Sequence, residues 1–317
     1  MMLRDAVNDY IAWRRAHGAK FDSGARLLYL FLEHVDGSIG CDTVVQADVL
    51  DFLAGRGPLT RYRANKYGAL AGFYRYAISR GYLTRSPLPA RNSEPRRSRS
   101  VPSYVYSRNE LQRLFDAIGI SRRGSHQIDA DTLRTLPLLL YGAGQRFGEA
   151  RRPTLGDVDL PDALLTIRDT KFYKTRLVPV CPKLADALGA HAAKRAERPF
   201  PKGTASTFLA NRDGAPLAER TTRTAFAKLL KVAGIGLPGD GRRAPCLHSL
   251  RHAAAVHRLE SRYRQGADVQ RLLPALSIWL GHTKLDGTRV YLSMTPELPR
   301  QASVRFDAYV NEGDNHE

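Results

Sequence analysis

Residues 279–298 read WLGHTKLDGTRVYLSMTPEL, and the interpretation of the whole chain starts from this stretch. It places His282 nine residues before Tyr291. A tyrosine hydroxyl has an unperturbed pKa of about 10, so it becomes a good nucleophile at neutral pH only beside a base or a group of cations. Tyr291 is one of 14 tyrosines, and a tyrosine on a helix is more often half-buried core. A functional site here therefore depends on matching segments elsewhere.

The segment CLHSLRHAAA, residues 246–255, supplies residues that suit a phosphate. His248 and Arg251 are three apart and share a helix face. An arginine binds phosphate oxygens through two hydrogen bonds, and a histidine exchanges protons near neutral pH. His248 and His252 also have zinc-ligand spacing, but the arginine between them repels a divalent cation and the glutamate of HExxH is missing. We therefore favour a phosphate site and predict no metal.

The segment YGAGQRFGEA, residues 141–150, presents Arg146 and Glu149 just after the end of a predicted helix. Taken alone, Arg146 has the simpler explanation of a side chain that caps a helix C-terminus.

The segment RDTKFYKTRLVPV, residues 168–180, presents Lys171 at a turn between two short strands. Lys174 is an alternative for the same role, and either lysine could be an ordinary solvated turn residue. The joint occurrence of all these segments, in one order along the chain, favours a single site.

The order arginine, lysine, HxxR, LGH and tyrosine resembles that of the tyrosine recombinases, also called phage-type integrases. The resemblance covers the whole chain. The sequences of the motif segments are closer to those of integrases and transposases of mobile elements than to those of the Xer branch. The resemblance implies that Arg146 and Arg251 clamp the scissile phosphate and that Tyr291 is the nucleophile. Lys171 would be the general acid and His248 the general base. His282 would donate a hydrogen bond to the phosphate, and Glu149 would support the site.

The chemistry of phosphodiester cleavage independently needs these residue types. Attack gathers negative charge on the non-bridging oxygens, which preorganised cations stabilise. The 5′ alkoxide is a poor leaving group, so a general acid accelerates its departure. A covalent 3′-phosphotyrosine keeps the phosphodiester energy, so rejoining needs no ATP, in agreement with a sequence that has no GxxxxGK[ST] loop. We predict no cofactor.

The composition indicates a polyanionic partner. Lys and Arg total 49 against 31 Asp and Glu, a formal net charge of +18. The basic residues are spread along the chain rather than gathered in one amphipathic helix, which favours double-stranded DNA over a membrane. The start has no secretion signal and the three cysteines lie far apart, so we expect a cytoplasmic protein, associated with the bacterial nucleoid.

Apolar periodicity predicts a mostly α-helical protein of two domains. Residues 1–90 read as a helical domain, by resemblance the SAM-like core-binding domain that binds DNA. Residues 91–103, rich in Pro, Ser and Arg, read as a basic linker. Residues 104–317 read as the catalytic domain, mainly α with a small antiparallel sheet. The predicted helices are residues 3–17, 25–35, 45–53, 61–80, 107–118, 132–141, 183–196, 220–233, 249–260 and 268–280, and the strands are 164–167 and 177–180.

The longest helix of the first domain, residues 61–80, carries basic residues and tyrosines opposite its apolar stripe. This face either lies along DNA phosphates or is simply solvated. The candidate DNA contacts are Arg61, Arg63, Lys66, Arg75, Arg96, Arg97, Arg99 and Lys174. The resemblance further implies a homotetramer on two DNA duplexes, with companion recombinases or accessory DNA-bending proteins as further candidate partners.

Two alternatives remain beside a recombinase. One is a catalytically degenerate accessory factor that binds DNA without cleaving it, and the complete set of six catalytic residue types argues against it. The other is a relaxing enzyme like the type IB topoisomerases, which share the chemistry. The short chain and the separate N-terminal helical domain argue against that one.

Overall fold

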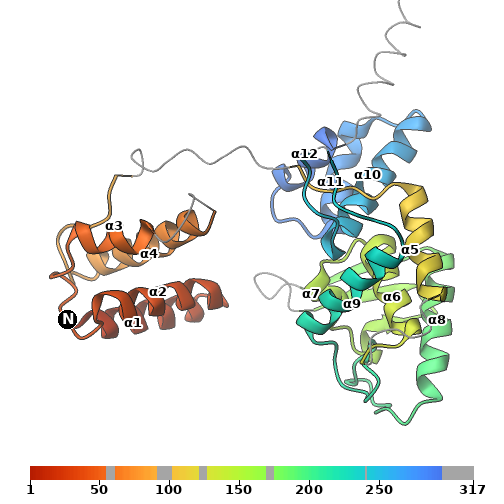
Figure 1. Ribbon diagram of the computed structural model, residues 1–317, viewed down its shortest axis with the longest axis horizontal. Coiled ribbons are helices and arrows are strands. Elements are labelled where there is room, and N and C mark those ends of the chain that lie inside the picture. Colours follow the sequence, from red (N-terminus) through yellow and green to blue (C-terminus); the bar gives the residue numbers. More distant parts are fainter. Residues whose placement is uncertain (55–60, 91–101, 121–126, 169–174, 240, 295–317) are drawn as a thin grey trace, which may run out of the picture. The chain divides into compact units, whose positions relative to one another are not determined.

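The computed structural model describes residues 1–54, 61–90, 102–120, 127–168, 175–239 and 241–294, without the side chains of residues 61 and 120. The chain divides into two compact units, Met1–Ser100 and Val101–Glu317 (Figure 1). Both are mainly helical. No helix within these ranges is long and apolar enough to cross a membrane.

The N-terminal unit packs its helices around an aromatic core. Its described helices are α1 (Leu3–Ala16), α2 (Asp22–Val35), α3 (Gln46–Ala54) and α4 (Arg61–Ser79). The predicted apolar stripe of the longest helix is confirmed, since Leu70, Phe73, Tyr74 and Ala77 of α4 are all buried. Gly81 ends that helix as predicted, with a φ of +72°, a conformation that glycine adopts at little cost.

The second unit has a large apolar core and a smaller apolar cluster, and the smaller one is formed by its last three described helices. Its described helices are α5 (Arg108–Ile120), α6 (Ala130–Gly142), α7 (Phe147–Ala150), α8 (Pro182–Ala196), α9 (Glu219–Val232), α10 (Leu247–Arg264), α11 (Val269–Leu280), α12 (Asp286–Ser293) and the 3₁₀ turn η2 (Leu155–Asp157). Helix α10 packs chiefly on α6. Ala253, Ala254 and Ala255 of α10 are wholly buried, and such small side chains let a helix approach its neighbours closely.

A small antiparallel sheet lies beside these helices. Its strands β1 (Val158–Asp159), β2 (Leu164–Ile167) and β3 (Arg176–Pro179) follow one another in space, with Leu165 opposite Val178. Pro179 lies on β3, an edge strand, where a residue that cannot donate a backbone hydrogen bond is tolerated. The turn between β2 and β3 that carries Lys171 and Lys174 lies outside the described residues.

The predicted fold class, mostly α with a small antiparallel sheet, is confirmed. The capping box at the start of α5 is also present, because the Ser107 amide donates to Glu110 Oε2 at 2.8 Å and the Glu110 amide donates to Ser107 Oγ at 3.2 Å. The predicted segmentation missed α7, β1 and the bounds of α12, and α10 runs four residues past its predicted end to Arg264. Helix α7, strand β1 and helix α12 are short, whereas the prediction for α10 overlooked Gly266, which follows the C-cap residue of that helix with a φ of +83°. Residues 91–101 of the predicted linker lie outside the described residues.

Candidate active site

One face of α10 and the facing residue of α12 form the centre of the site. His248, Arg251 and His252 lie at spacings of three and four along α10, so they share a face, and α12 packs against that helix. The Tyr291 side chain comes from α12 and is 2% exposed. The pairing that the sequence suggested, HxxR with a distant tyrosine, is thus brought together by the packing of the two helices.

Arg251 is the most deeply placed cation of the site, at 1% exposure. Its guanidinium donates to the Gly144 carbonyl at 2.5 Å and to the Leu280 carbonyl at 2.6 Å. Burial, with a further contribution from the Arg146 charge, lowers the pKa of Arg251 to about 10, so it stays protonated at neutral pH. The carbonyl at the end of α11 adds the negative end of a helix dipole to its surroundings.

Arg146 follows a turn that only glycine allows. Gly144 has a φ of +60°, and a Cβ there would lie 2.3 Å from the Trp279 ring. Arg146 then precedes α7 as its N-cap residue, while its side chain reaches the C-cap residue of α11, Gly281. Its guanidinium donates to Glu149 Oε1 and to the Gly281 carbonyl, both at 2.7 Å. The side chain remains 36% exposed, so part of it is open to a ligand.

Glu149 joins two guanidiniums, and one of them was not predicted. Arg176 of β3 donates to its carboxylate at 2.8 and 3.3 Å, beside the bonds from Arg146. Burial alone would raise the pKa of Glu149, but the hydrogen bonds and charges of the two arginines outweigh this effect and hold the pKa at about 2. The carboxylate of Glu149 thus fixes the direction of the Arg146 side chain.

His282 and His252 both contact Tyr291. The His282 ring is stacked on the Tyr291 ring, with centroids 6.1 Å apart and an interplanar angle of 10°. Its Nδ1 lies 2.8 Å from the Thr288 hydroxyl. Nδ1 of His252 lies 3.3 Å from the Tyr291 hydroxyl. The sequence had suggested His252 only as a zinc ligand; its i, i+4 spacing from His248 was the signal that it shares the site.

The electrostatics of the site favour an anion. Burial, followed by the charges of Arg251 and Arg146, lowers the pKa of His282 to about 4, so this histidine is neutral at pH 7. Partial loss of hydration and the same two charges lower the pKa of the more exposed His248. Burial raises the pKa of Tyr291, while the charge and hydrogen bonding of Arg251 oppose that rise. A bound phosphate would stabilise both the guanidiniums and a protonated histidine.

Several predicted contact residues fall elsewhere. Lys171, Lys174, Arg96, Arg97 and Arg99 lie outside the described residues, as does the side chain of Arg61. Within the described ranges, no group of three or more His, Cys, Asp or Glu could hold a metal ion.

The predicted basic face of α4 is corrected in part. Tyr74 and Tyr76 are 1% and 9% exposed, so they pack in the core rather than between phosphates. Lys66 donates from Nζ to the Phe52 carbonyl at 2.6 Å and lies over the Phe52 ring, so it already has a structural role. Arg75 is exposed.

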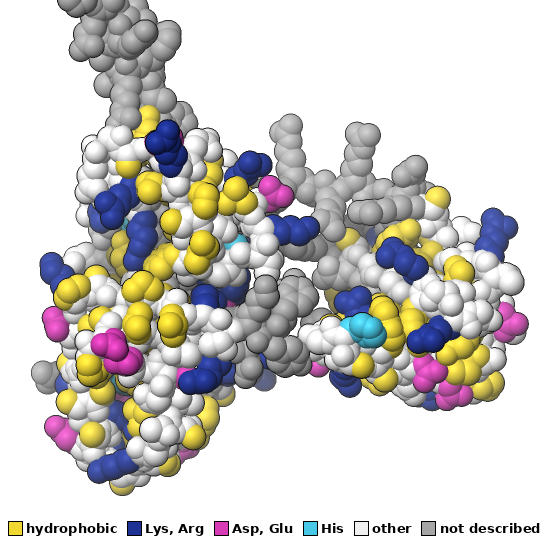
Figure 2. All heavy atoms as spheres, turned by 180° about the vertical axis from the view of Figure 1, so that it is seen from behind, with side chains coloured by type: hydrophobic (Ala, Val, Ile, Leu, Met, Phe, Trp, Pro, Cys, Tyr) yellow, Lys and Arg dark blue, Asp and Glu magenta, His cyan; other side chains and the backbone are white. Residues whose placement is uncertain are grey.

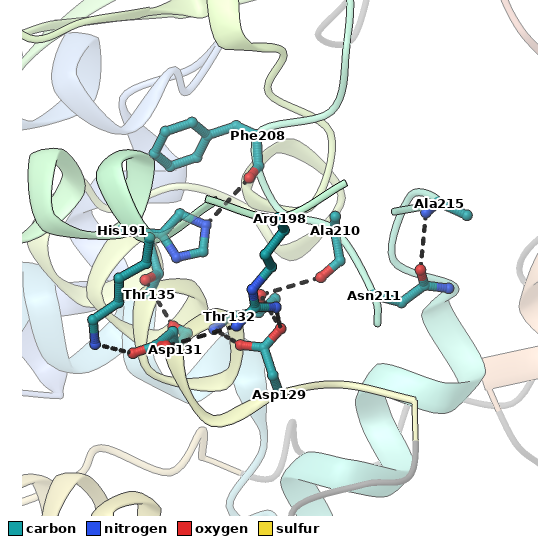
Figure 3. Close-up of polar contacts among 11 residues, drawn as sticks. Asp129, Asp131, Thr132, Thr135, His191, Arg198, Phe208, Ala210, Asn211 and Ala215 are labelled. Atoms are coloured by element: carbon teal, nitrogen blue, oxygen red, sulfur yellow. Dashed lines mark hydrogen bonds and ion pairs between the residues drawn. The ribbon is translucent and has the colours of Figure 1, made fainter. Parts of the chain in front are cut away.

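A second charged cluster, of Asp129, Asp131, His191, Lys194 and Arg198, occurs in the same unit, and Figure 3 shows its polar contacts. We call it the structural cluster. Arg198 lies 2.6 Å from Asp129, and Lys194 lies 2.7 Å from Asp131, so both carboxylates are paired with cations. His191 reaches the Phe208 carbonyl at 3.2 Å through Nε2. The cavity at this cluster is only about 10 Å³ in volume, room for roughly one water molecule, so it offers no substrate site.

Comparison with known proteins agrees with this geometry. The sequence profile of the phage integrase family matches residues 105–297, a range that contains Arg146, Arg251 and Tyr291. The chain is 33% identical over 308 residues to a putative integrase/recombinase, y4rE, of Sinorhizobium fredii, covering 96% of this chain and 95% of the relative. It is 31% identical over 211 residues to the tyrosine recombinase XerA of Thermococcus kodakarensis, covering 67% of this chain and 65% of the relative.

Solved structures share the fold at low sequence identity. The integrase of the Tn1549 transposon, solved with circular intermediate DNA, has a TM-score of 0.66 at 17% identity and covers 90% of this chain and 94% of its own. A lambda integrase dimer bound to a core site has a TM-score of 0.62, also at 17% identity, covering 90% and 96%.

The family match and the shared fold together define an enzyme of DNA recombination. The chain belongs to the phage integrase family and is a tyrosine recombinase, a site-specific DNA recombinase.

Proposed function

We propose that this enzyme cleaves duplex DNA at specific sites of a mobile element and rejoins the strands through a 3′-phosphotyrosine on Tyr291. The observation that carries the proposal is the position of the Tyr291 hydroxyl, beside His252 and under the charge of the buried Arg251. The oxygen of Tyr291 attacks the scissile phosphorus, the bond to the 5′ oxygen breaks, and the phosphodiester energy is kept in the new bond. Attack by the freed 5′ hydroxyl of a partner strand reverses the step.

The protein supplies the charge that this reaction needs. Arg146 and Arg251 bind the non-bridging oxygens, where negative charge increases in the transition state. His282 donates a further hydrogen bond to the phosphate, with its Nδ1 held at the Thr288 hydroxyl. His248 completes the group of residues around the phosphate. We assign Lys171, with Lys174 as the alternative, as the acid that protonates the departing 5′ oxygen.

We further propose that the N-terminal unit holds the flanking DNA, with residues 1–90 as its domain, residues 91–103 as a linker and residues 104–317 as the catalytic domain. A hollow of about 490 Å³ between α1 and α4 supports this. Its rim carries Arg14, Arg75 and Arg80, and no carboxylate lines it. Lys and Arg side chains are scattered over the visible face of both units in Figure 2, which suits contact along an extended phosphate backbone.

The assembly is proposed to be four copies on two duplexes, with DNA-bending proteins or companion recombinases as further partners, acting on nucleoid DNA in the cytoplasm. Solution mass measurement with and without the two-site DNA tests the number of copies. A complex that holds two copies on one duplex at saturating DNA would contradict the tetramer.

The decisive experiment for the activity uses a nicked duplex that carries the end sequence of the element. After cleavage the short strand diffuses away from the nick, so the covalent adduct accumulates and survives denaturation. Wild type is expected to form the adduct, and Tyr291→Phe is expected to form none, because its ring lacks the attacking oxygen. An adduct with Tyr291→Phe would show that another residue is the nucleophile.

Two controls separate the alternatives. Cleavage is expected to continue in EDTA, because Arg146 and Arg251 supply the charge; loss of cleavage would contradict this mechanism. Strong DNA binding by wild type without adduct on any cognate DNA would favour the accessory-factor alternative. Relaxation of supercoiled DNA that lacks the recombination site would favour the topoisomerase alternative.

A further inference from the structure

Three histidines and one tyrosine meet in the active site, but they do not contact the tyrosine oxygen in the same way. Nδ1 of His252 lies at hydrogen-bonding distance of the Tyr291 hydroxyl, at 3.3 Å. His282 faces the Tyr291 ring in a stacked arrangement and uses its Nδ1 on Thr288. His248 lies edge-to-face against His252, with ring centroids 4.6 Å apart.

We propose that His252, not His248, receives the proton of the Tyr291 hydroxyl when that oxygen attacks the phosphate. This inference rests on the proposed function and adds a catalytic residue to it. The resemblance to the family had assigned the base to His248. His248 is exposed, and it remains available to the incoming phosphate.

The proposed step balances in protons and bonds. Nδ1 of neutral His252 accepts the hydroxyl proton of Tyr291, while the phenolic oxygen forms its bond to phosphorus. The bond from phosphorus to the 5′ oxygen breaks, and that oxygen takes a separate proton from the lysine acid. In the reverse reaction the imidazolium of His252 returns its proton to Tyr291. Arg251, which also faces the hydroxyl, cannot serve because an arginine stays protonated.

The charges around His252 make this base dependent on the substrate. Burial is the largest cause that lowers the pKa of His252, to about 3 in the free protein. The neighbouring charges add to this effect, those of His248, Arg251, Arg243 and His282. The ring is therefore neutral and able to accept a proton, but a weak base. A phosphate bound between Arg146 and Arg251 brings negative charge beside the ring and favours its protonated form. Tyr291 is thus activated only when DNA occupies the site.

The test replaces the ring nitrogen by a group of similar reach. His252→Asn keeps a polar atom near the Nδ1 position but cannot take up a proton, and His248→Asn is the matched control on the same helix face. Adduct formation is measured on the nicked duplex and on the same duplex with sulfur in place of the bridging 5′ oxygen. A thiolate leaves without an acid, so the sulfur substrate corrects defects of acid catalysis and not those of base catalysis.

We expect His252→Asn to slow adduct formation about 100-fold on both substrates, the usual size of a general-base contribution. The acid side of its pH profile should also lose one ionisation, whereas His248→Asn should keep it. A rate within about three-fold of wild type, or a defect that the sulfur substrate removes, would overturn the proposal.

DNA affinity serves as the control for correct folding, and both variants should keep the affinity of wild type. Where His252→Asn is unstable, His252→Ala with added imidazole gives the answer, because only folded protein with a vacant ring position can regain activity. No gain with imidazole would count against the base role. If wild type itself forms no adduct, the proposed function fails; if wild type does and His252→Asn matches it, only this inference fails.

Discussion

The active site and the structural cluster of Figure 3 are two charged groups in one unit, built on different charge balances. In the structural cluster, Asp129 and Asp131 are paired with Arg198 and Lys194. Among the described residues of the active site, Glu149 supplies the carboxylate that faces the guanidiniums of Arg146 and Arg176, while Arg251 lies on backbone carbonyls. A cluster that neutralises its own charges stabilises the fold, whereas one left positive is completed by an anionic substrate.

The largest expected effect compares two buried arginines with similar surroundings. Arg251 donates to the Gly144 and Leu280 carbonyls, and Arg195, 4% exposed, donates to the Thr207 and Pro201 carbonyls. We expect Arg251→Met to slow cleavage about 1000-fold, because it removes preorganised charge from the phosphate site. Arg195→Met should lower stability and leave the cleavage rate per folded molecule unchanged. Adduct kinetics measure the cleavage rate, and urea unfolding measures the stability of each variant. Equal losses of cleavage rate in the two variants would show that the two arginines do not differ in this way.

The next effect tests the Glu149 carboxylate of the active site. Glu149→Gln leaves two guanidiniums facing a neutral amide, so we expect the free energy of unfolding to fall by about 3 kcal/mol. The double variant Glu149→Gln with Arg176→Met removes one of the unpaired charges and should recover part of this loss. Urea titrations of the two single variants and the double variant give the coupling energy. If the losses of unfolding free energy in the two single variants add up to the loss in the double variant, Glu149 and Arg176 do not interact.

The cation-rich surroundings should also appear in the pH dependence of stability. The pKa of His282 is about 4 in the folded protein, below its ordinary value of about 6.5. The unfolded chain therefore takes up a proton first, so this contribution is complete above pH 6.5 and is lost as the pH falls toward 4. Because the ring is partly exposed, we expect a loss of roughly 1–2 kcal/mol over this window. His282→Asn, which can keep the bond to Thr288, should flatten the thermal-unfolding profile there.

The structural cluster supplies the matching measurement. Burial lowers the pKa of His191, but Asp129 and Asp131 oppose that shift. His191→Asn should therefore flatten the same profile less than His282→Asn does. The reverse order would show that the arginines of the active site do not control its histidines.

The smallest effect concerns the N-terminus of α6, where Asp129 is the N-cap residue. Asp129 accepts the Thr132 amide at 2.8 Å as an N-cap and pairs with Arg198. Asparagine caps a helix equally well, so Asp129→Asn loses only the charge of the pair, for which we expect about 1 kcal/mol. Cleavage per folded molecule should not change, as checked by adduct kinetics at a temperature well below unfolding. A clear loss of cleavage would connect the two clusters.

Much of the fold and part of the site could be predicted from the sequence. Long helices show a 3.6-residue period, and few residue types can handle a phosphate, so Arg146, Arg251, His282 and Tyr291 stood out by type and order. Helix α7 was missed because four residues are too short to show a period.

Two members of the site depend on packing and were therefore not found. The role of Arg176 depends on the contact of β3 with Glu149, and a strand sequence alone does not show this contact. The contact of His252 with Tyr291 depends on how α10 and α12 pack. The spacing of His248 and His252 showed a shared face but could not show which of the two rings reaches the nucleophile.

The turn at Gly144 also provides a way to observe the site. Trp279 fills the space that a side chain at Gly144 would need, and Arg258 lies 4.0 Å above its ring centroid. The chain has only two tryptophans, and the other, Trp13, is a partly exposed residue of the N-terminal unit. With Trp13→Phe, the intrinsic fluorescence therefore comes from a single indole packed against the turn that leads to Arg146. That signal reports, without any added label, whether the phosphate clamp is assembled.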